Sequence, residues 1–81
     1  MEQFHQHDLE RLWYRLKPDE RRCVYAYRVS ASKAEAARRI GKNQKWLEYS
    51  SRAHPEFREA MDRAWEWDHD EMKRLTYADL R

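Results

Sequence analysis

The chain has 81 residues, of which 40% are charged and 41% hydrophobic, and its formal net charge is +2. This length predicts one domain over residues 1–81 with a thin core, because a chain of this size buries only about 60% of its unfolded surface. A single Cys excludes an internal disulfide and indicates a reducing compartment, and the lack of a long apolar run argues against a membrane span or a signal peptide. We therefore expect a cytoplasmic protein, and one Gly with two Pro favours an all-α fold with few turns.

The first half of the chain predicts two helices that meet at a proline. Apolar residues at positions 9, 12, 13 and 16 have helical spacing, which predicts a first helix over about 4–16, with Phe4 extending its apolar stripe. Lys17-Pro18 ends that helix, because the residue before proline avoids the α region. Pro18 suits the first turn of a second helix to about Val29, with Asp19 and Glu20 near its positive end and Cys23 on its buried face.

The middle of the chain has the pattern of a helix-turn-helix over about 32–52. Ser32 and Glu35 have the spacing of a capping box, in which Glu35 reaches back to the cap. Gly41 supplies the turn and Asn43 caps the next helix. These signals predict helices over 33–40 and 44–52, the second of which usually enters the major groove of DNA.

A fifth and longer helix is predicted to follow the recognition helix. His54-Pro55 ends the fourth helix, and Pro55 begins the next one. Apolar residues recur at helical spacing after Pro55, and Met72 and Leu75 extend the same face, so we expect this helix to reach about residue 75. The predicted fold is therefore a small five-helix domain that contains a helix-turn-helix and a longer C-terminal helix.

Charge is unevenly distributed along the chain. Residues 1–54 hold 12 Lys and Arg against seven Asp and Glu, whereas residues 55–81 hold five against eight. The local excess is strongest over residues 38–52, where five cations stand against Glu48 alone. A basic patch on a nearly neutral chain fits a face that binds a polyanion. The alternative is an ordinary solvated surface.

Two segments resemble phage helix-turn-helix proteins. Leu16-Lys-Pro-Asp-Glu-Arg-Arg-Cys-Val-Tyr-Ala-Tyr-Arg-Val, followed by Ala34-Glu-Ala-Ala-Arg-Arg-Ile-Gly41, resembles the N-terminal DNA-binding domain of terminase small subunits. His54-Pro-Glu-Phe-Arg-Glu-Ala-Met resembles the stretch that follows the recognition helix in many such proteins, and the likeness covers about residues 16–64. The resemblance implies a domain that binds duplex DNA at a viral packaging site, or a phage transcriptional regulator. It also implies assembly into an oligomer, a large terminase subunit as a partner, and a location in the cytoplasm of a bacterial host cell.

Three positions differ from the family's pattern. Lys42 stands where an aliphatic residue usually follows the Gly, and Ser50 stands where a large apolar residue usually packs the recognition helix. Trp46 occupies a position that is usually small and polar. Trp46 is therefore the candidate to take over the packing that Ser50 does not supply.

The recognition helix predicts which side chains meet DNA. A helical wheel points Lys45, Tyr49 and Arg52 outward together, with Trp46 and Glu48 at the flanks. Cations can bind phosphate or guanine, an amide can pair with adenine and a carboxylate can accept from cytosine. The predicted DNA-binding residues are Arg38, Arg39, Lys42, Gln44, Lys45, Glu48, Tyr49 and Arg52.

Other interpretations of these residues remain open. Glu48 and Arg52 are an i, i+4 pair that could satisfy each other on a wet surface. Trp65 is expected in the core, whereas Trp67 is either exposed or covered by the first helix and Trp13. Trp65, Trp67 and Met72 are the candidate surface for a homo-oligomer or for a host or viral protein. That interaction module is the alternative function.

The sequence gives little indication of catalysis or of a cofactor. His5 and His7 are two residues apart and point different ways on a helix, and His69 and Asp70 lie far off, so no metal site is expected. His54 is expected to cap a helix or lie at the surface, and Cys23 is expected to be a packed thiol. No Gly-rich phosphate loop exists in a chain with one Gly. We expect no enzyme and no cofactor.

Overall fold

Six short helical elements make up the described part of the chain. The structure is a computed structural model that describes residues 2–68, 70 and 72–74. The elements are α1 (Glu2–Tyr14), α2 (Pro18–Tyr27), α3 (Lys33–Arg39), α4 (Gln44–Ala53), α5 (Pro55–Asp62) and the 3₁₀ turn η1 (Ala64–Glu66). Residues 70 and 72–74 beyond η1 are also helical. The all-α prediction is confirmed, and no strand occurs in these ranges.

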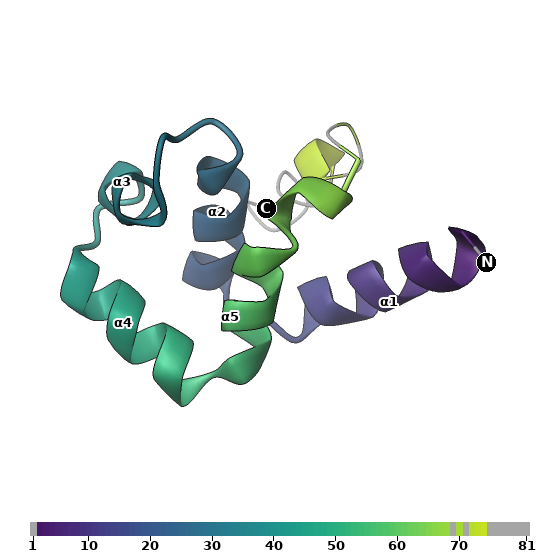
Figure 1. The fold of residues 1–81 in the computed structure, drawn as a ribbon, viewed down its shortest axis with the longest axis horizontal. Coiled ribbons are helices and arrows are strands. Elements are labelled where there is room, and N and C mark those ends of the chain that lie inside the picture. The colour runs from purple at the N-terminus through teal and green to yellow at the C-terminus, as the bar shows by residue number, and fades with distance from the viewer. Residues whose placement is uncertain (1, 69, 71, 75–81) are drawn as a thin grey trace.

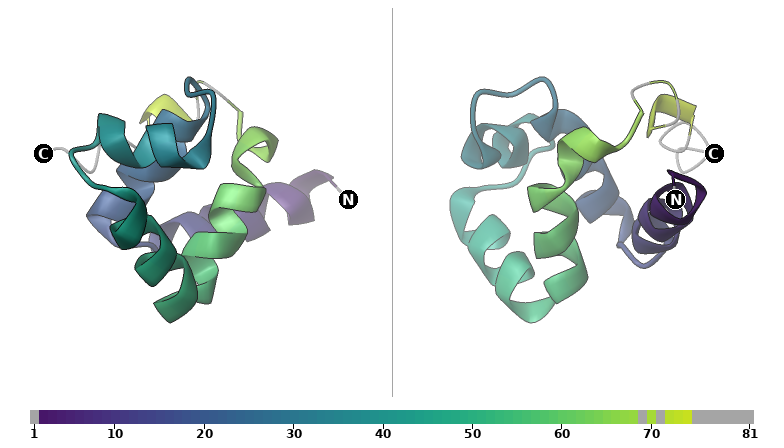
Figure 2. Two further views of the ribbon diagram at one scale, coloured as in Figure 1. Left: turned by 60° about the vertical axis from the view of Figure 1, so that its left-hand side comes forward. Right: turned by 45° about the vertical axis from the view of Figure 1, so that its right-hand side comes forward.

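Helices α2 to α5 pack around one another, and α1 extends away from them. Figure 1 shows α4 at one edge of the molecule and α1 at the opposite edge. Helix α2 packs against α3 and α5, and α4 contacts both α3 and α5. The two views of Figure 2 show α4 and α5 meeting at the turn through residues 53–55 and diverging from it. This arrangement leaves the outer side of α4 uncovered by any other described helix.

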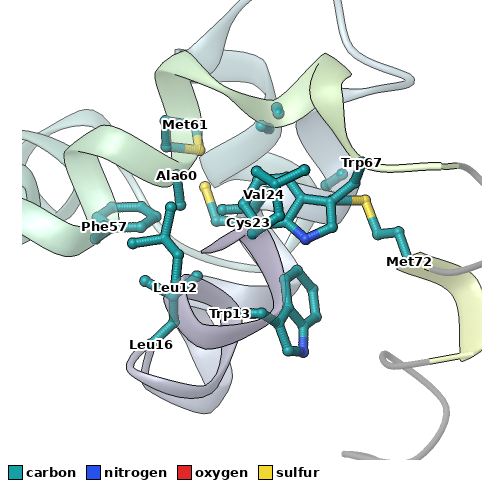
Figure 3. Close-up of a cluster of buried hydrophobic side chains, with 14 of the residues drawn as sticks. Leu12, Trp13, Leu16, Cys23, Val24, Phe57, Ala60, Met61, Trp67 and Met72 are labelled. Carbon is teal, nitrogen blue, oxygen red and sulfur yellow. The ribbon is translucent and has the colours of Figure 1, made fainter. Parts of the chain in front are cut away.

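The core forms where the apolar stripes of α1, α2 and α5 meet. Its largest fully buried side chains are Trp13, Phe57, Met61, Met72, Val24 and Cys23, and Figure 3 shows them in one cluster that runs from Phe57 to Met72. Helix α1 contributes Leu9, Leu12, Trp13 and Leu16, at the spacing that the sequence predicts for its buried face. Phe4 lies among residues whose side chains are not described.

An ion pair also ties α1 to the end of α5. Arg63 Nη1 lies 2.8 Å from Asp8 Oδ2 and 3.1 Å from Glu59 Oε2. The hydrogen bond that Arg63 donates to Asp8 is the main cause that raises the pKa of Arg63 above its already high value, and the Glu59 carboxylate adds to it. Arg63 is therefore a permanent charge that links the first helix to the fifth.

The C-terminal helix is shorter than the sequence predicts. Helix α5 ends at Asp62, the chain continues as η1, and Trp67 has extended backbone angles (φ −73°, ψ 140°). Arg28 of the α2 C-terminus compensates for this break, because its guanidinium donates to the Ala64 carbonyl at 3.1 Å and to the Trp67 carbonyl. The prediction of one helix to residue 75 is wrong, because contacts with α1 and α2 outweigh the helical periodicity. Residue 75 lies outside the described residues.

The break in α5 exchanges the expected roles of two tryptophans. Trp67 is 3% exposed and its ring meets that of Trp13 edge-on, with ring centres 5.8 Å apart. Trp65 instead is 57% exposed. The expectation of a core Trp65 is wrong, and of the two possibilities for Trp67, coverage by Trp13 is the one observed.

Candidate nucleic-acid interface

The corner between α3 and α4 fixes the direction of the candidate recognition helix. Ser32 Oγ accepts a hydrogen bond from the Glu35 N–H at 3.1 Å, so the predicted cap of α3 is confirmed. Glu35 Oε2 accepts from the Ala31 N–H at 2.8 Å, one residue before the expected partner. The first turn of α3 is thus held from both sides, as a capping interaction requires.

Gly41 ends α3 in the left-handed conformation. Its φ is +80°, which an L side chain rarely adopts. The Lys42 N–H donates to the Ala37 carbonyl at 2.9 Å, and the Gly41 N–H donates to the Arg38 carbonyl at 3.0 Å. This pair of bonds is a Schellman motif, which satisfies the last carbonyls of a helix and reverses the chain. The reversal sets the angle at which α4 leaves the corner.

Helix α4 begins at a capped residue and packs through two side chains. Asn43 Oδ1 accepts from the Trp46 N–H at 2.9 Å, which confirms the predicted cap. Leu47 is 8% exposed, and the rings of Trp46 and Phe57 lie 5.6 Å apart between centres. Trp46 therefore supplies, from α4 onto α5, the packing that the small Ser50 does not.

The opposite side of α4 carries Lys45, Tyr49 and Arg52. All three are exposed, and Tyr49 is 72% exposed. Their spacing of four and three residues places them on one face of a helix. Figure 1 shows that no described helix covers this outer side of α4. All three are therefore accessible to a ligand, and their common projection remains a prediction from the helical spacing.

Ion pairing separates the cations near this face into two groups. Lys42 Nζ lies 3.3 Å from Asp19 Oδ2, and Arg39 Nε lies 3.7 Å from Glu35 Oε2. Within the described ranges no acidic side chain lies within 4.0 Å of Arg38, Lys45 or Arg52. These last three are the cations of the patch that an incoming anion can meet without displacing a protein carboxylate.

Asp19 anchors the turn side of the patch to α2. Its pKa is lowered from 3.8 chiefly by a hydrogen bond from Arg22, while burial opposes this effect and Lys42 adds to it. Lys42 also lies over the Trp46 ring, 5.9 Å from its centre. Lys42 therefore has a structural role at the corner in addition to any contact with a ligand.

Glu48 is paired with an amide and not with Arg52. Gln44 Nε2 donates to Glu48 Oε1 at 3.2 Å. The i, i+4 ion pair with Arg52 that the sequence left open is not formed among the described contacts. The hydrogen bond directs this carboxylate oxygen toward the start of α4, one turn away from Arg52.

Three concave surfaces involve α4 in the described part of the chain, and one of them lies at its start, lined by Asn43, Gln44, Lys45 and Glu48. A second lies toward the start of α2 and is lined by Lys17, Pro18, Asp19, Glu20, Trp46, Tyr49, Ser50, Ala53 and His54. The third lies toward the start of α5 and is lined by Glu48, Ser51, Arg52 and Arg58. The sequence-based site omitted both Lys17 and Arg58. The available signal for Arg58 was its position one turn after the Pro55 helix start, close to the end of α4.

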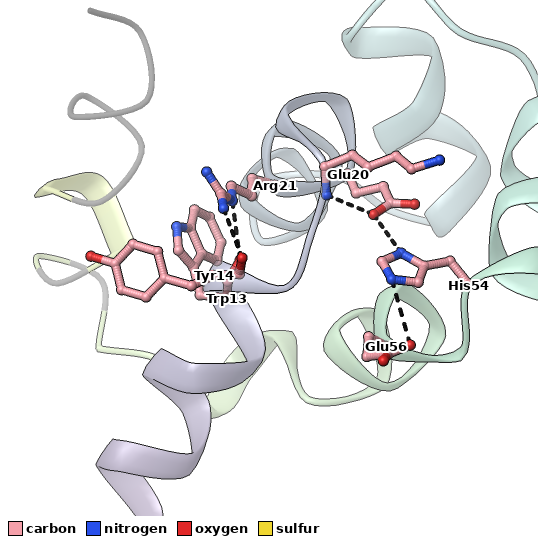
Figure 4. A network of polar contacts seen from close by, with 7 residues as sticks. Trp13, Tyr14, Glu20, Arg21, His54 and Glu56 are labelled. Atoms are coloured by element: carbon pink, nitrogen blue, oxygen red, sulfur yellow. Dashed lines mark hydrogen bonds and ion pairs between the residues drawn. The ribbon is translucent and has the colours of Figure 1, made fainter.

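A half-buried histidine holds the far end of α4. His54 Nδ1 lies 2.8 Å from Glu20 Oε1, which also accepts from the Lys17 N–H at 2.8 Å. Its other ring nitrogen lies 3.5 Å from Glu56 Oε1, as Figure 4 shows. His54 is the N-terminal flanking residue of α5, as expected, but its side chain makes no cap hydrogen bond there. It instead joins α4 and α5 to α2.

The three residues expected to form a partner surface do not lie together on the outside. Trp67 and Met72 are 3% and 0% exposed and belong to the core of the chain itself. Their assignment to an interface is wrong, because the break after α5 turns them inward against α1. Trp65 alone is exposed, with its ring edge-on to Tyr27 at 4.7 Å between centres.

Cys23 has the surroundings of a packed thiol. It is fully buried, and burial, with a smaller contribution from the Glu20 carboxylate, raises its pKa to about 12. A thiol with this pKa carries almost no thiolate at neutral pH, and the thiolate is the reactive form. The predicted burial of Cys23 is confirmed.

No other chemistry-bearing cluster or long apolar helix is found in the described part of the chain. No group of three or more His, Cys, Asp or Glu lies there in an arrangement that could hold a metal ion. The side chains of His5, His7 and His69 lie outside the described ones. No helix over residues 2–68, 70 and 72–74 is both long and apolar enough to cross a membrane. Comparisons with protein-family models, with curated proteins and with solved structures found no significant match for this chain.

Proposed function

We propose that this protein binds duplex DNA, with α4 lying in the major groove. The observation that carries the proposal is the common outward face of Lys45, Tyr49 and Arg52 on a helix seated by a capped corner. A recognition helix needs this arrangement, because its inner face must pack while its outer face meets base edges and phosphates. Lys45 and Arg52 also have no described protein carboxylate within 4.0 Å.

Each residue of the face has a role in this proposal. Gln44 and Lys45 at the start of α4 meet base edges, and Arg52 and Tyr49 meet bases or phosphate further along. Arg38 and Arg39, at the end of α3, contact the DNA backbone together with Lys42. Backbone contacts of this kind fix position and add salt dependence and carry no sequence information directly.

Within this class we propose recognition of a phage packaging site, with transcriptional regulation as the next candidate. This narrower role follows from the resemblance of residues 16–64 to terminase small subunits. It brings with it assembly into an oligomer and contact with a large terminase subunit. The proposed role is binding, without catalysis and without a cofactor.

The test is a titration of fluorescently labelled 20-base-pair duplex with protein at several salt concentrations. The variant Lys45→Ala/Arg52→Ala removes two charges from the face, and we expect it to keep its fold and to lose most of its affinity. Its matched control is Arg11→Ala/Arg15→Ala, which removes the same charge from two exposed residues at the end of α1 and just after it, outside the α3–α4 corner. Equal affinity of both double variants, or no binding by the unaltered protein at low salt, would contradict the proposal.

A second candidate function is an interaction module for a host or viral protein. The specific observation is the exposed Trp65, which packs on Tyr27 at the end of the fold remote from α4. An aromatic anchor of this kind is typical of protein interfaces. Salt separates the two functions, because DNA binding weakens steeply as salt rises and an aromatic contact changes little.

A further inference from the structure

An open pocket lies beside the recognition helix, between the last turns of α4 and the first turn of α5. It is lined by Glu48, Ser51, Arg52 and Arg58. The chain reverses between α4 and α5 (Figure 2). Two arginines from these two helices therefore line one concave surface. The side chains of both arginines are exposed. A sequence pattern confined to α4 could not identify this pairing.

The charges in this pocket are not balanced by protein groups. Across the described residues, neither Arg52 nor Arg58 has a carboxylate within 4.0 Å. The one acid in the lining, Glu48, accepts a hydrogen bond from Gln44 on the preceding turn. Two guanidinium groups that share a concavity repel each other unless an anion lies between them. The pocket therefore holds a net positive charge that a bound anion would neutralise.

The donors in the lining fit a phosphate group. Arginine offers a planar fork of N–H donors that matches phosphate oxygens in pairs, and it keeps its charge at every physiological pH. The Ser51 hydroxyl adds a neutral donor at the same surface. Hydroxyl and arginine donors together are the usual contacts to DNA phosphates.

We propose that this pocket holds a backbone phosphate of the DNA strand that borders the groove occupied by α4, with Arg58 as the contact from α5. This inference rests on the proposed DNA-binding function. A helix in the major groove is bordered by a phosphate backbone on each side. Arg58 belongs to a neighbouring helix and stands beside α4, so it meets that border and not the base edges. Its contribution is accordingly independent of DNA sequence.

The experiment measures the salt dependence of binding to the labelled 20-base-pair duplex for three variants. Loss of one phosphate contact lowers the slope of log K against log salt by about 0.9. We expect this decrease for Arg58→Ala, a smaller one for Arg58→Lys, and a similar loss on duplexes of unrelated sequence. The matched control is Arg11→Ala, which removes one exposed charge from α1 and should leave the slope unchanged.

The outcomes separate this inference from the function on which it rests. If the unaltered protein binds and Arg58→Ala keeps its full slope, the phosphate site is wrong and the DNA-binding proposal stands. If Arg58→Ala and Arg11→Ala lower the slope equally, the effect is one of net charge and the site is also wrong. If the unaltered protein fails to bind at low salt, both proposals fall. A circular dichroism melt confirms that each variant is folded. If Arg58→Ala does not fold, Arg58→Gln replaces it in the same measurement.

Discussion

Glu20 Oε1 and His54 Nδ1 lie 2.8 Å apart and join the start of α2 to the junction of α4 and α5. The same carboxylate oxygen accepts the Lys17 N–H, so one atom both caps α2 and holds the end of the candidate recognition helix. Glu20 is 3% exposed, which makes it the buried charged residue of the described fold. A buried carboxylate costs free energy unless hydrogen bonds compensate it, and these two bonds supply that compensation (Figure 4).

Removal of either partner should therefore destabilise the fold. We expect Glu20→Ala and His54→Ala each to lower the free energy of unfolding by ~1–3 kcal/mol, because the first leaves the half-buried His54 ring without Glu20 and the second leaves the buried Glu20 carboxylate with one of its two bonds. The double variant should lose less than the sum of the two, since both changes break one shared contact. Urea denaturation of the four proteins measures this coupling.

Glu56→Gln is the matched control for this cycle. Glu56 lies 3.5 Å from the other ring nitrogen of His54 and is more exposed than Glu20. Its replacement should change the free energy of unfolding by no more than ~1 kcal/mol, as is typical of exposed pairs. Strictly additive losses for the Glu20 and His54 variants would show that the 2.8 Å contact contributes little.

The exchange of Trp65 and Trp67 gives a second prediction. Trp67→Ala should lower the free energy of unfolding by ~3–5 kcal/mol, because it empties a buried site beside Trp13. Trp65→Ala should lower the free energy of unfolding by no more than ~0.5–1.5 kcal/mol, which is the typical contribution of an edge-on aromatic contact such as the one with Tyr27. Urea denaturation measures both losses. Iodide quenches exposed tryptophans, so quenching of the fluorescence should decrease more in Trp65→Phe than in Trp67→Phe. A larger loss of stability in Trp65→Ala would contradict the described end of α5.

The corner of the helix-turn-helix could be predicted because its signals are local. Ser32 and Asn43 cap the helices that follow them, and Gly41 takes the positive φ that the reversal needs. Each of these effects is decided by atoms within about four residues of the signal. Prolines 18 and 55 act in the same way at the starts of α2 and α5. Periodicity then identified the buried side of α1 and of α4.

The features that sequence reasoning missed depend on contacts between distant residues. Helix α5 ends early because Arg28 binds the carbonyls of Ala64 and Trp67, which lie 36 and 39 residues away. Glu20 and His54 are separated by 34 residues. The place of Arg58 beside α4 depends on the angle between two helices, which no periodic pattern encodes. The end of α5, the Glu20–His54 contact and the place of Arg58 all depend on how helices pack against one another. The helical wheel of a single segment contains no information about that packing.

Cys23 gives a prediction for alkaline pH. Its pKa in the folded protein is about 12, against 9.0 when exposed, so the folded state holds its proton more tightly than the unfolded state. The resulting stability is fully present below pH 9 and is lost as the pH rises from about 9 to 12. Stability of the unaltered protein should fall more steeply over this range than that of Cys23→Ala. A thiol reagent at pH 8 should label the native protein slowly and the denatured protein at once; rapid native labelling would exclude a packed thiol.

Glu48 gives the most specific prediction for the proposed DNA-binding face. It is exposed between Lys45 and Arg52 and carries the one negative charge of that surface. Glu48→Gln retains an amide oxygen that can accept the hydrogen bond from Gln44. We therefore expect the free energy of unfolding to change by less than ~0.5 kcal/mol. Removal of the charge should strengthen binding to duplex of mixed sequence about fivefold at low salt, since unit charges ~4 Å apart in water interact by ~1 kcal/mol.

The direction of this change distinguishes two roles for Glu48. A carboxylate that only repels phosphate predicts tighter binding to every duplex after Glu48→Gln. A carboxylate that accepts from the amino group of cytosine predicts weaker binding to duplexes that carry the preferred base, and a loss of discrimination among them. The matched control is Glu10→Gln, which removes one negative charge from α1 and should leave affinity unchanged. Because α1 and α4 lie at opposite edges of the molecule, an equal gain in both variants would mean that net charge, and not the α4 face, governs binding.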